Sequence, residues 1–313
     1  MLDNQSNQIS SYFLSFKNFI GIIISIICIY FVLESFNWIE FIKQLAKLNY
    51  FHLFFSILCL MISIILRAVR WRKIFGSNDV KIPDLYKAEV IGFWGNSLFP
   101  LRLGEIIRIH YAKVLTLKRY SFIFGTIILE RLIDLLIIMP FVFIFYYYFP
   151  IEIINSKMNF LLFTIPILII GFIGYKYFFQ SIKDKFLRDI QVNLIQNFID
   201  NIILLGFLSL SIWVLILLDV YFVQASMNLK FSMLDCLLIM FVATIVYAIP
   251  SSPGTIGTFH LAIQEVMVQF LGYTIDTSIA FAFILHAHSY LFFIILGSYY
   301  FFKDSKNILS FRK

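Results

Sequence analysis

Long apolar runs alternate with short polar segments along this chain. Six of the runs are long enough to cross about 30 Å of hydrocarbon as helices, the shorter ones with help from their flanks. They cover residues 19–35, 51–66, 120–149, 159–179, 201–224 and 277–302. This pattern predicts an all-α integral membrane protein with about six full spans.

Two further apolar stretches, 84–99 and 232–249, each run into a break that contains proline and glycine. Another helix-like segment follows each break, at 104–118 and at 254–271. A helix that is interrupted at membrane depth is tolerated where protein or a water-filled cavity satisfies the freed backbone groups. We therefore expect two re-entrant or broken-helix hairpins in addition to the six spans.

Composition supports a membrane protein, since 61% of the 313 residues are apolar and only 14% are charged. Such a chain requires a bilayer as its solvent. The net charge of +7 raises the alternative of nucleic-acid binding. However, the basic residues stand in short groups between apolar runs, as the positive-inside rule expects. We therefore expect no nucleic-acid partner.

The basic groups also orient the spans. With a cytoplasmic N-terminus, the nearly neutral segments 36–50 and 150–158 lie outside together with Lys230, and both hairpins must return to the side from which they entered. The tails at 1–18 and 303–313 are then cytoplasmic. The basic residues placed inside are Arg67, Arg70, Arg72, Lys73, Lys113, Lys118, Arg119, Lys176, Lys183, Lys185, Arg188, Lys303, Lys306, Arg312 and Lys313.

The chain also contains an internal repeat. A Pro-x-x-x-Gly spacing occurs at 100–104 and again, 150 residues later, at 250–254. The single transmembrane domain, 19–302, therefore divides into repeat 1 at about 19–149 and repeat 2 at about 159–302. Under the orientation above, the two hairpins enter from opposite sides, so the repeats are inverted. Inverted repeats with broken helices are typical of transporters.

The first hairpin carries charges that suit a phosphate. Pro100 ends one helix, Gly104 allows a tight turn, and a new helix can begin at Glu105. The free N–H groups of a helix start attract anions, and the arginines Arg102 and Arg108 can grip a phosphate. We expect Arg102, Gly104, Glu105 and Arg108 to bind a lipid head group. The alternative is an internal ion pair between Glu105 and Arg108, three residues apart on one helix face.

Three charged residues, Glu130, Arg131 and Asp134, interrupt the apolar run at 120–149. Glu130 and Asp134 share a helix face, so at least one of these carboxylates needs a cation or a proton. We expect Arg102 and Arg108 to be their partners. The alternatives are a structural charge network and a proton relay. The expected relay residues are Glu130, Arg131, Asp134 and His260.

The second hairpin, IPSSPGTIGTFH, supplies hydroxyl groups without a cation. One interpretation is that a serine or threonine caps a helix that begins at Pro253. The other is a mirrored head-group site. Its expected residues are Ser251, Ser252, Gly254 and Thr255.

Other kinds of site have little support. His286 and His288 lie at i, i+2 and face different directions on a helix, so we expect no metal. Cys28, Cys59 and Cys236 lie in apolar runs without C-x-x-C spacing, which indicates buried free thiols. Nucleotide-binding and serine-hydrolase motifs are missing, so we expect no cofactor and no enzymatic activity.

The segment RAVRWRK, 67–73, follows the apolar run at 51–66. Its simplest interpretation is an anchor at the cytoplasmic face that contacts anionic lipid. The residues of this expected anchor are Arg67, Arg70, Trp71 and Arg72.

Four motifs in this order, RAVRWRKIF, NSLFPLRLGEIIR, ERLIDLL and IPSSPGTIGTFH, resemble the lysylphosphatidylglycerol synthase transmembrane-region family. The resemblance spans about residues 50–300. It implies a bacterial or archaeal plasma-membrane protein that moves, or assists in moving, a charged lipid between leaflets. The positions that match the family pattern are Arg70, Trp71, Pro100, Arg102, Gly104, Glu105, Arg108, Glu130, Arg131, Asp134, Pro250, Pro253, Gly254 and Gly257.

Two positions depart from the family pattern. Relatives often have a carboxylate where His260 stands and glycine where Thr255 stands, so the ligand or the coupling ion can differ here. We also expect no lysyl-lipid synthesis, because the chain has no soluble aminoacyl-transferase domain.

Our leading hypothesis is therefore a flippase-like protein for a phosphate-containing lipid: a phospholipid, an aminoacyl phospholipid or a polyprenyl-phosphate-linked sugar. One alternative is a membrane enzyme that acts on a lipid-linked group, with Glu130 or Asp134 as base. Another is a non-catalytic scaffold for a glycosyltransferase or an envelope-biogenesis complex. The expected partners are a membrane lipid and, second to it, a glycosyltransferase or a lipid-synthesis enzyme.

Overall fold

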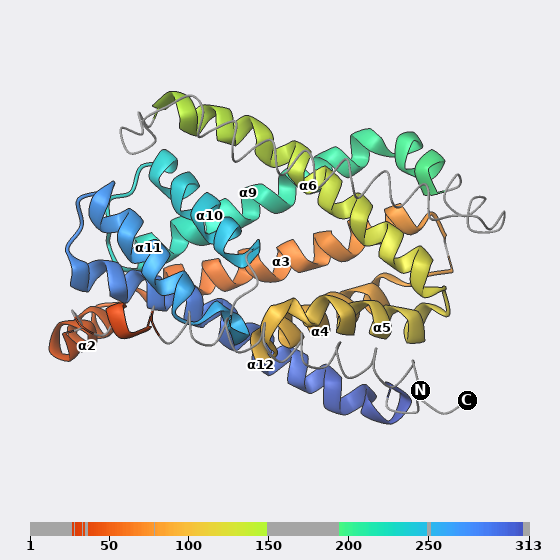
Figure 1. The fold of residues 1–313 in the computed structure, drawn as a ribbon, viewed down its shortest axis with the longest axis horizontal. Helices are drawn as coiled ribbons and strands as arrows, with labels where there is room; N and C mark the ends of the chain where they lie inside the picture. Colours follow the sequence, from red (N-terminus) through yellow and green to blue (C-terminus); the bar gives the residue numbers. More distant parts are fainter. Residues whose placement is uncertain are drawn as a thin grey trace, which may run out of the picture.

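The computed structural model describes residues 27–148, 194–248 and 252–308, apart from residues 28, 33, 35, 36 and 78. Within these ranges every regular element is a helix (Figure 1), which confirms the all-α prediction for them. The elements are α2 (Trp38–Ala46), α3 (Tyr50–Phe75), α4 (Ile82–Leu98), η1 (Pro100–Arg102), α5 (Gly104–Thr116), α6 (Tyr120–Tyr148), α9 (Ile202–Ser226), α10 (Met233–Ala248), η2 (Pro253–Thr255), α11 (Thr258–Gln269) and α12 (Ile275–Ile308).

Three of the described helices, α3, α9 and α12, are long and apolar enough to cross a membrane. Helix α6 is also long, but three charged residues interrupt its apolar run. Helix α10 is apolar and has 16 residues, which correspond to about 24 Å of helix. The predicted run at 159–179 lies outside the described residues, and so does most of the run at 19–35. The total of six spans therefore stays a prediction.

Helices α3 and α9 form an antiparallel pair near the centre of the molecule (Figure 1). Ser56, early on α3, donates a hydrogen bond to Asp219, late on α9. Arg70, late on α3, donates to Ser209, early on α9. Because α3 continues to Phe75, the segment RAVRWRK lies within the helix rather than beyond its end.

The first predicted hairpin is present as α4, η1 and α5. Gly104, at the start of α5, packs against the α4 backbone near Gly92 and Asn96, and a Cβ atom added to Gly104 would overlap both. Further along the same pair, Gly92 packs against Arg108. The chain therefore folds back on itself, so α4 and α5 are antiparallel. Helix α5 begins at Gly104, close to the predicted helix start.

The second predicted hairpin is present as α10, η2 and α11. The turn η2 contains Gly254, whose φ of 61° is in the left-handed region that favours glycine. The turns η1 and η2 contact each other, and α4 also contacts η2, so the two hairpins meet at their breaks. The described elements follow one order twice: a long helix, a short helix, a 3₁₀ turn, a short helix and another long helix.

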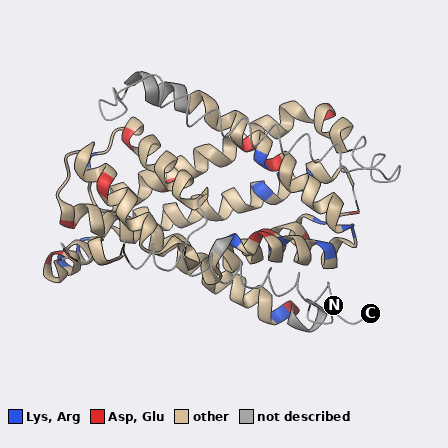
Figure 2. Ribbon diagram, viewed as in Figure 1, with Lys and Arg blue, Asp and Glu red and all other residues tan. Residues whose placement is uncertain are grey.

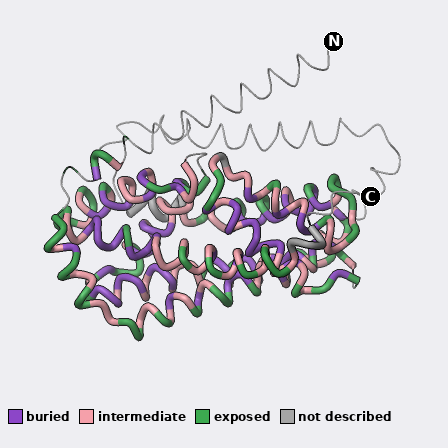
Figure 3. Tube along the Cα trace, turned by 90° about the horizontal axis from the view of Figure 1, so that it is seen from below, coloured by how far each residue is buried: buried purple, intermediate pink, exposed green. Residues whose placement is uncertain are grey.

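Buried residues lie mainly between the helices, whereas exposed residues follow their outer sides (Figure 3). One core cluster joins α9 to α12, and another joins α3 to α6. Large apolar side chains cover the outward faces of the long helices, which is typical of a surface that contacts lipid. Examples are Phe54, Ile65, Ile203, Phe207, Leu291, Ile295 and Phe302.

Candidate functional site

A network of buried ion pairs lies where α3, α4, α5 and α6 meet, as the charged positions in Figure 2 indicate. Arg108 on α5 binds Glu89 on α4 and Glu130 on α6, the latter at 2.6 Å. Arg70 on α3 binds Asp134 at 2.6 Å and lies 3.5 Å from Glu130. All five side chains are less than one-tenth exposed. The network therefore joins four helices through charges that have very little contact with solvent.

Trp71 packs against this network through its aromatic ring. The Arg108 guanidinium lies 3.9 Å from the centre of the Trp71 ring, and the Trp71 indole donates to Thr126 at 2.8 Å. A cation over an aromatic face gains up to about 2 kcal/mol when it is desolvated. Arg108 is thus held by two carboxylates and an aromatic ring. These contacts indicate that Arg108 stabilises the packing of the helices.

These contacts correct three sequence predictions. Arg70 and Trp71 are not a lipid anchor, because both are buried inside the bundle where no lipid head group reaches them. Arg108 is not free to bind a phosphate, because its guanidinium group is already bound to the carboxylates of Glu89 and Glu130. The expected pairing of Asp134 was also wrong, since Asp134 binds Arg70 rather than Arg102 or Arg108. The same prediction is confirmed for Glu130, which binds Arg108.

A second, more exposed group of charges lies at the edge of the network. Glu105 accepts a hydrogen bond from Arg131 at 2.9 Å. It also lies 3.8 Å from Arg102 and 3.9 Å from Arg108. The predicted alternative of ion pairing within the first hairpin is therefore present, although Arg131 is the closest partner of Glu105.

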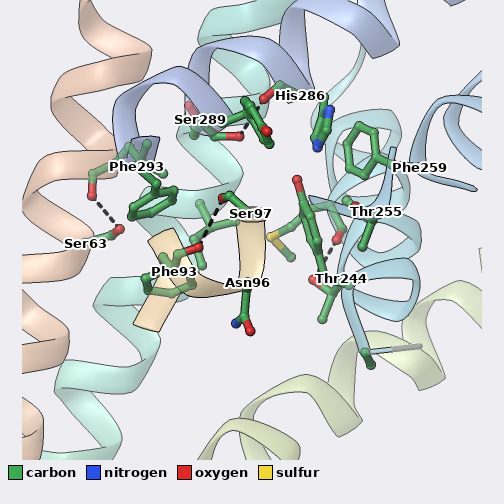
Figure 4. Close-up of a pocket in the computed structure, with 18 of the residues that line it drawn as sticks. Ser63, Phe93, Asn96, Ser97, Thr244, Thr255, Phe259, His286, Ser289 and Phe293 are labelled. Atoms are coloured by element: carbon green, nitrogen blue, oxygen red, sulfur yellow. Dashed lines mark hydrogen bonds between the residues drawn. The ribbon is translucent and has the colours of Figure 1, made fainter. Parts of the chain in front are cut away.

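A cavity of about 470 Å³ opens beside the meeting point of η1 and η2. Its walls come from the long helices α3, α6, α9 and α12, from α4, α10 and α11, and from the two turns. Apolar side chains form most of the wall. In Figure 4, Asn96 and Ser97 of α4 lie near Thr255 of η2, with His286 and Ser289 of α12 above them.

Three arginines, Arg67, Arg102 and Arg131, also line this cavity. Arg67 has no hydrogen bond or ion pair within the described ranges, and its guanidinium carbon lies 5.9 Å from the centre of the Phe93 ring. Arg102 has one distant ion pair with Glu105. The guanidinium groups of Arg67 and Arg102 therefore keep donors free for an anion.

Two residues of the cavity wall, Asn96 and Trp213, each also have an uncharged polar atom that lies buried behind the cavity surface and lacks a partner within the described ranges. Asn96 Oδ1 and Trp213 Nε1 are buried without a hydrogen bond in the described part of the chain. Such atoms are unfavourable unless water or a ligand satisfies them. The cavity thus combines apolar walls with a few unsatisfied polar groups, as small-molecule sites usually do.

The predicted site residues divide between the cavity wall and the packed interior. The expected head-group and relay residues that line the cavity are Arg102, Ser252, Gly254, Thr255, Arg131 and Asp134. Gly104, Glu105, Arg108 and Glu130 lie behind the wall, and Ser251 lies outside the described residues. Of the expected anchor, Arg67 lines the cavity and Arg72 is partly exposed.

The second hairpin places a backbone carbonyl oxygen near His286, and no described side chain caps η2 or α11. Helix α11 begins after Gly257 without a side-chain cap, and the Ser252 hydroxyl donates instead to the Ile256 carbonyl oxygen. The short 3₁₀ helix η2 does begin at Pro253, but neither it nor α11 has the expected side-chain cap from a serine or threonine. The carbonyl oxygen of Gly254 lies 2.7 Å from Nε2 of His286, and His260 packs edge-on against the same imidazole. His260 lies next to the cavity but does not line it.

Two buried carboxylates were missed in the sequence. Glu89 lies on α4 and binds Arg108, while Asp219 lies on α9 near Ser56 and His288. Both stand inside apolar stretches, which is the signal that could have identified them. Within the described ranges, no three His, Cys, Asp or Glu side chains gather in a way that could hold a metal ion.

Apolar helices with apolar outer faces, two broken hairpins and a network of buried charges between α3, α4, α5 and α6 define a multi-pass membrane protein. Its internal cavity is mostly apolar and has a few polar groups on its wall. The chain belongs to the lysylphosphatidylglycerol synthase transmembrane-region family, because the model of that family, described as Lysylphosphatidylglycerol synthase TM region, matches residues 18–297. The resemblance found in the sequence is thereby confirmed. A UPF0104 membrane protein of Methanocaldococcus jannaschii is 30% identical over 228 residues, which cover 68% of this chain and 95% of that protein. No solved structure matches the chain.

Proposed function

We propose that this protein moves, or assists in moving, a phosphate-containing lipid between the two leaflets of the plasma membrane. The observation that carries the proposal is the cavity between the hairpin breaks, with Arg67 and Arg102 on its wall. An anionic or zwitterionic head group offers phosphate oxygens that suit these guanidinium groups. The acyl or prenyl chains would stay in the bilayer, against the apolar outer faces of the helices.

The arrangement of the two halves supports this proposal. Each half contains a broken hairpin, the breaks meet beside the cavity, and the corresponding long helices α3 and α9 are antiparallel. Inverted repeats in transporters place the substrate site at such an interface and expose it to each side in turn. A lipid-synthesis enzyme or a glycosyltransferase would supply or consume the lipid, whereas the protein itself would make no covalent change.

The test uses the purified protein in vesicles of phosphatidylcholine and phosphatidylglycerol that contain a trace of fluorescently labelled phosphatidylglycerol. Dithionite quenches only the labelled head groups in the outer leaflet, so the rate of quenching reports movement between leaflets. We expect Arg67→Ala and Arg102→Ala each to slow this movement by about tenfold or more, since a hydrogen bond from a charged group contributes about 1.5–3 kcal/mol.

Lys73→Ala is the matched control, because Lys73 is an exposed cation on the same helix as Arg67 but away from the cavity. Its rate should equal that of the unmodified protein. Unchanged movement in both arginine variants would contradict the proposed function. A new lipid mass after incubation with the protein would instead identify an enzyme.

A further inference from the structure

A second buried polar cluster lies at the other end of the α3–α9 pair. Ser56 Oγ donates to Asp219 Oδ1, and His288 Nε2 lies 2.9 Å from the same oxygen. The side chains of Asp219 and His288 are only 10% and 7% exposed, and Asp219 lines the cavity. Ser56 and Arg70 are fourteen residues apart on α3, or about 21 Å along the helix. The cluster is therefore separate from the arginine network.

The hydrogen bonds of His288 determine where its hydrogens lie. Nδ1 is 3.0 Å from the Ile284 carbonyl oxygen, which can only accept, so Nδ1 carries a hydrogen. Nε2 faces a carboxyl oxygen of Asp219, and two lone pairs at 2.9 Å would repel each other. A second hydrogen therefore lies between Nε2 and Oδ1. Whether the pair is imidazolium with carboxylate or imidazole with carboxylic acid, it holds one exchangeable proton and has no net charge.

The same arrangement occurs once in each half of the chain. In one half, Arg70 on α3 is bound by Asp134 on α6 and Ser209 on α9. In the other half, Asp219 on α9 is bound by His288 on α12 and Ser56 on α3. The counterparts are Arg70 and Asp219, Ser56 and Ser209, and Asp134 and His288, separated by 149, 153 and 154 residues.

The two clusters differ in what a proton can do. Arg70 keeps its charge at every physiological pH, so its pair with Asp134 is permanent. An aspartate and a histidine can release the proton that they share. The second cluster therefore holds a proton that can pass to the cavity, which Asp219 lines.

Among the described residues, the ionisable groups that interact with the pair do not include a lysine or an arginine. Cys59 on α3 and Tyr247 on α10 interact electrostatically with Asp219, and His286 on α12 interacts with His288. His260 on α11 packs against His286 and not directly against the pair. No lysine or arginine forms an ion pair with Asp219 in the part of the chain that the structure describes. The shared proton is thus what keeps the buried carboxylate neutralised.

We infer that Asp219 and His288 form a proton-binding site that couples proton movement to lipid movement; this inference rests on the proposed function. When the proton passes to water entering the cavity, Asp219 becomes an unpaired carboxylate and His288 a neutral imidazole with its hydrogen on Nδ1. Nε2 and Oδ1 then repel each other, which drives α12 away from α9. Because both helices line the cavity, loss of the proton changes the shape of its wall, and proton entry from the other side restores it.

The first experiment tests the proton site without any lipid transport. The histidines of the full chain are labelled with ¹⁵N, the protein is placed in lipid nanodiscs, and the His288 signal is assigned by its loss in His288→Gln. We expect this signal to change in one step between about pH 5 and pH 8, the range in which a histidine side chain ordinarily changes its charge. The step should move by more than one pH unit in Asp219→Asn, which keeps the shape of the side chain. A His288 signal that does not change over this range would overturn the inference.

The second experiment tests the coupling in the dithionite assay with a pH gradient across the vesicle membrane. The quantity measured is the ratio of the rates with the gradient in its two directions, which does not depend on the absolute rate. The control is His110→Gln, because His110 lies on α5 beside the Tyr120 hydroxyl and does not line the cavity. We expect the ratio to differ from one in the unmodified protein and in this control, and to fall to one in Asp219→Asn and His288→Gln. A ratio that stays unchanged in both variants would overturn the coupling. If the unmodified protein moves no lipid, the proposed function fails, while the ¹⁵N titration still decides the proton site.

Discussion

Among single residues, Arg108 has the most complete set of partners. It places a full positive charge within the bundle, between Glu89 and Glu130 and over the Trp71 ring. Removal of one member of a buried ion pair leaves an unpaired charge, which destabilises a protein by about 3–5 kcal/mol. The position of Arg108 should therefore matter for folding more than for lipid binding.

This reasoning gives a stability prediction for Arg108→Met, which keeps an apolar side chain of similar length. We expect it to lower the free energy of unfolding by about 3–5 kcal/mol, because Glu89 and Glu130 lose their shared partner. The measurement is denaturant-induced unfolding in detergent micelles, followed by tryptophan fluorescence. Arg131→Met is the matched control, since Arg131 is 45% exposed and pairs at the edge, where ion pairs contribute at most about 1 kcal/mol. If both variants lost the same free energy of unfolding, burial of the Arg108 ion pairs would not explain their contribution to stability.

Among the elements, the α4–α5 hairpin depends on the close approach of two backbones. Gly104 packs against the carbonyl oxygen of Gly92 and the backbone nitrogen of Asn96, so no side chain fits there. Because the atoms that crowd Gly104 belong to the backbone, a new side chain cannot be relieved by a change of rotamer. The hairpin also brings Arg102 to the cavity and Arg108 to the ion network.

We therefore expect Gly104→Ala to separate α4 from α5 and to lower the unfolding midpoint strongly, with loss of lipid movement. Gly206→Ala is the control, because Gly206 lies in helix α9 with no atom within 4 Å of an added Cβ. This change should stabilise the protein by about 0.4–1 kcal/mol, since alanine restricts the unfolded chain and suits a helix better. Thermal unfolding of both variants in the same detergent measures the difference. A Gly104→Ala protein as stable as the unmodified chain would contradict the packing.

At the scale of the whole molecule, the charges and the apolar outer faces describe how the protein sits in a membrane. The basic groups predict cytoplasmic termini, and the two halves predict opposite entry of the hairpins. The loop between α5 and α6 should face the cytoplasm, and the loop between α9 and α10 should face outside.

Cysteine labelling in intact cells tests this orientation. Leu117, 89% exposed, and Lys230, also exposed, stand in the two loops. We expect a membrane-impermeant maleimide to label Lys230→Cys in intact cells and Leu117→Cys only after the membrane is made permeable. The unmodified chain provides the background from its own cysteines. The opposite pattern would invert the predicted sides of these two loops. Labelling of both positions in intact cells would contradict the three spans predicted between them, at 120–149, 159–179 and 201–224.

Much of the architecture follows from local properties of the chain. Apolar runs without charges must be buried or face lipid, and a proline followed closely by a glycine favours a break between helices, so helices and breaks were visible in the pattern of residues. The break at Pro100 and the helix start at Gly104 are examples. The family was equally evident from four short motifs.

The partners and the burial of each charged side chain were decided by tertiary structure. Arg67, Arg70 and Arg72 look alike in one basic segment, yet Arg67 lines the cavity, Arg70 is buried and Arg72 is partly exposed, because a helix turns each residue by about 100°. Asp219 likewise has no partner nearby in sequence, and its proton-sharing histidine lies 69 residues away. Sequence by itself determines which side chains a membrane makes costly; only the packing of distant helices determines which of them neutralise each other and which remain available to a ligand.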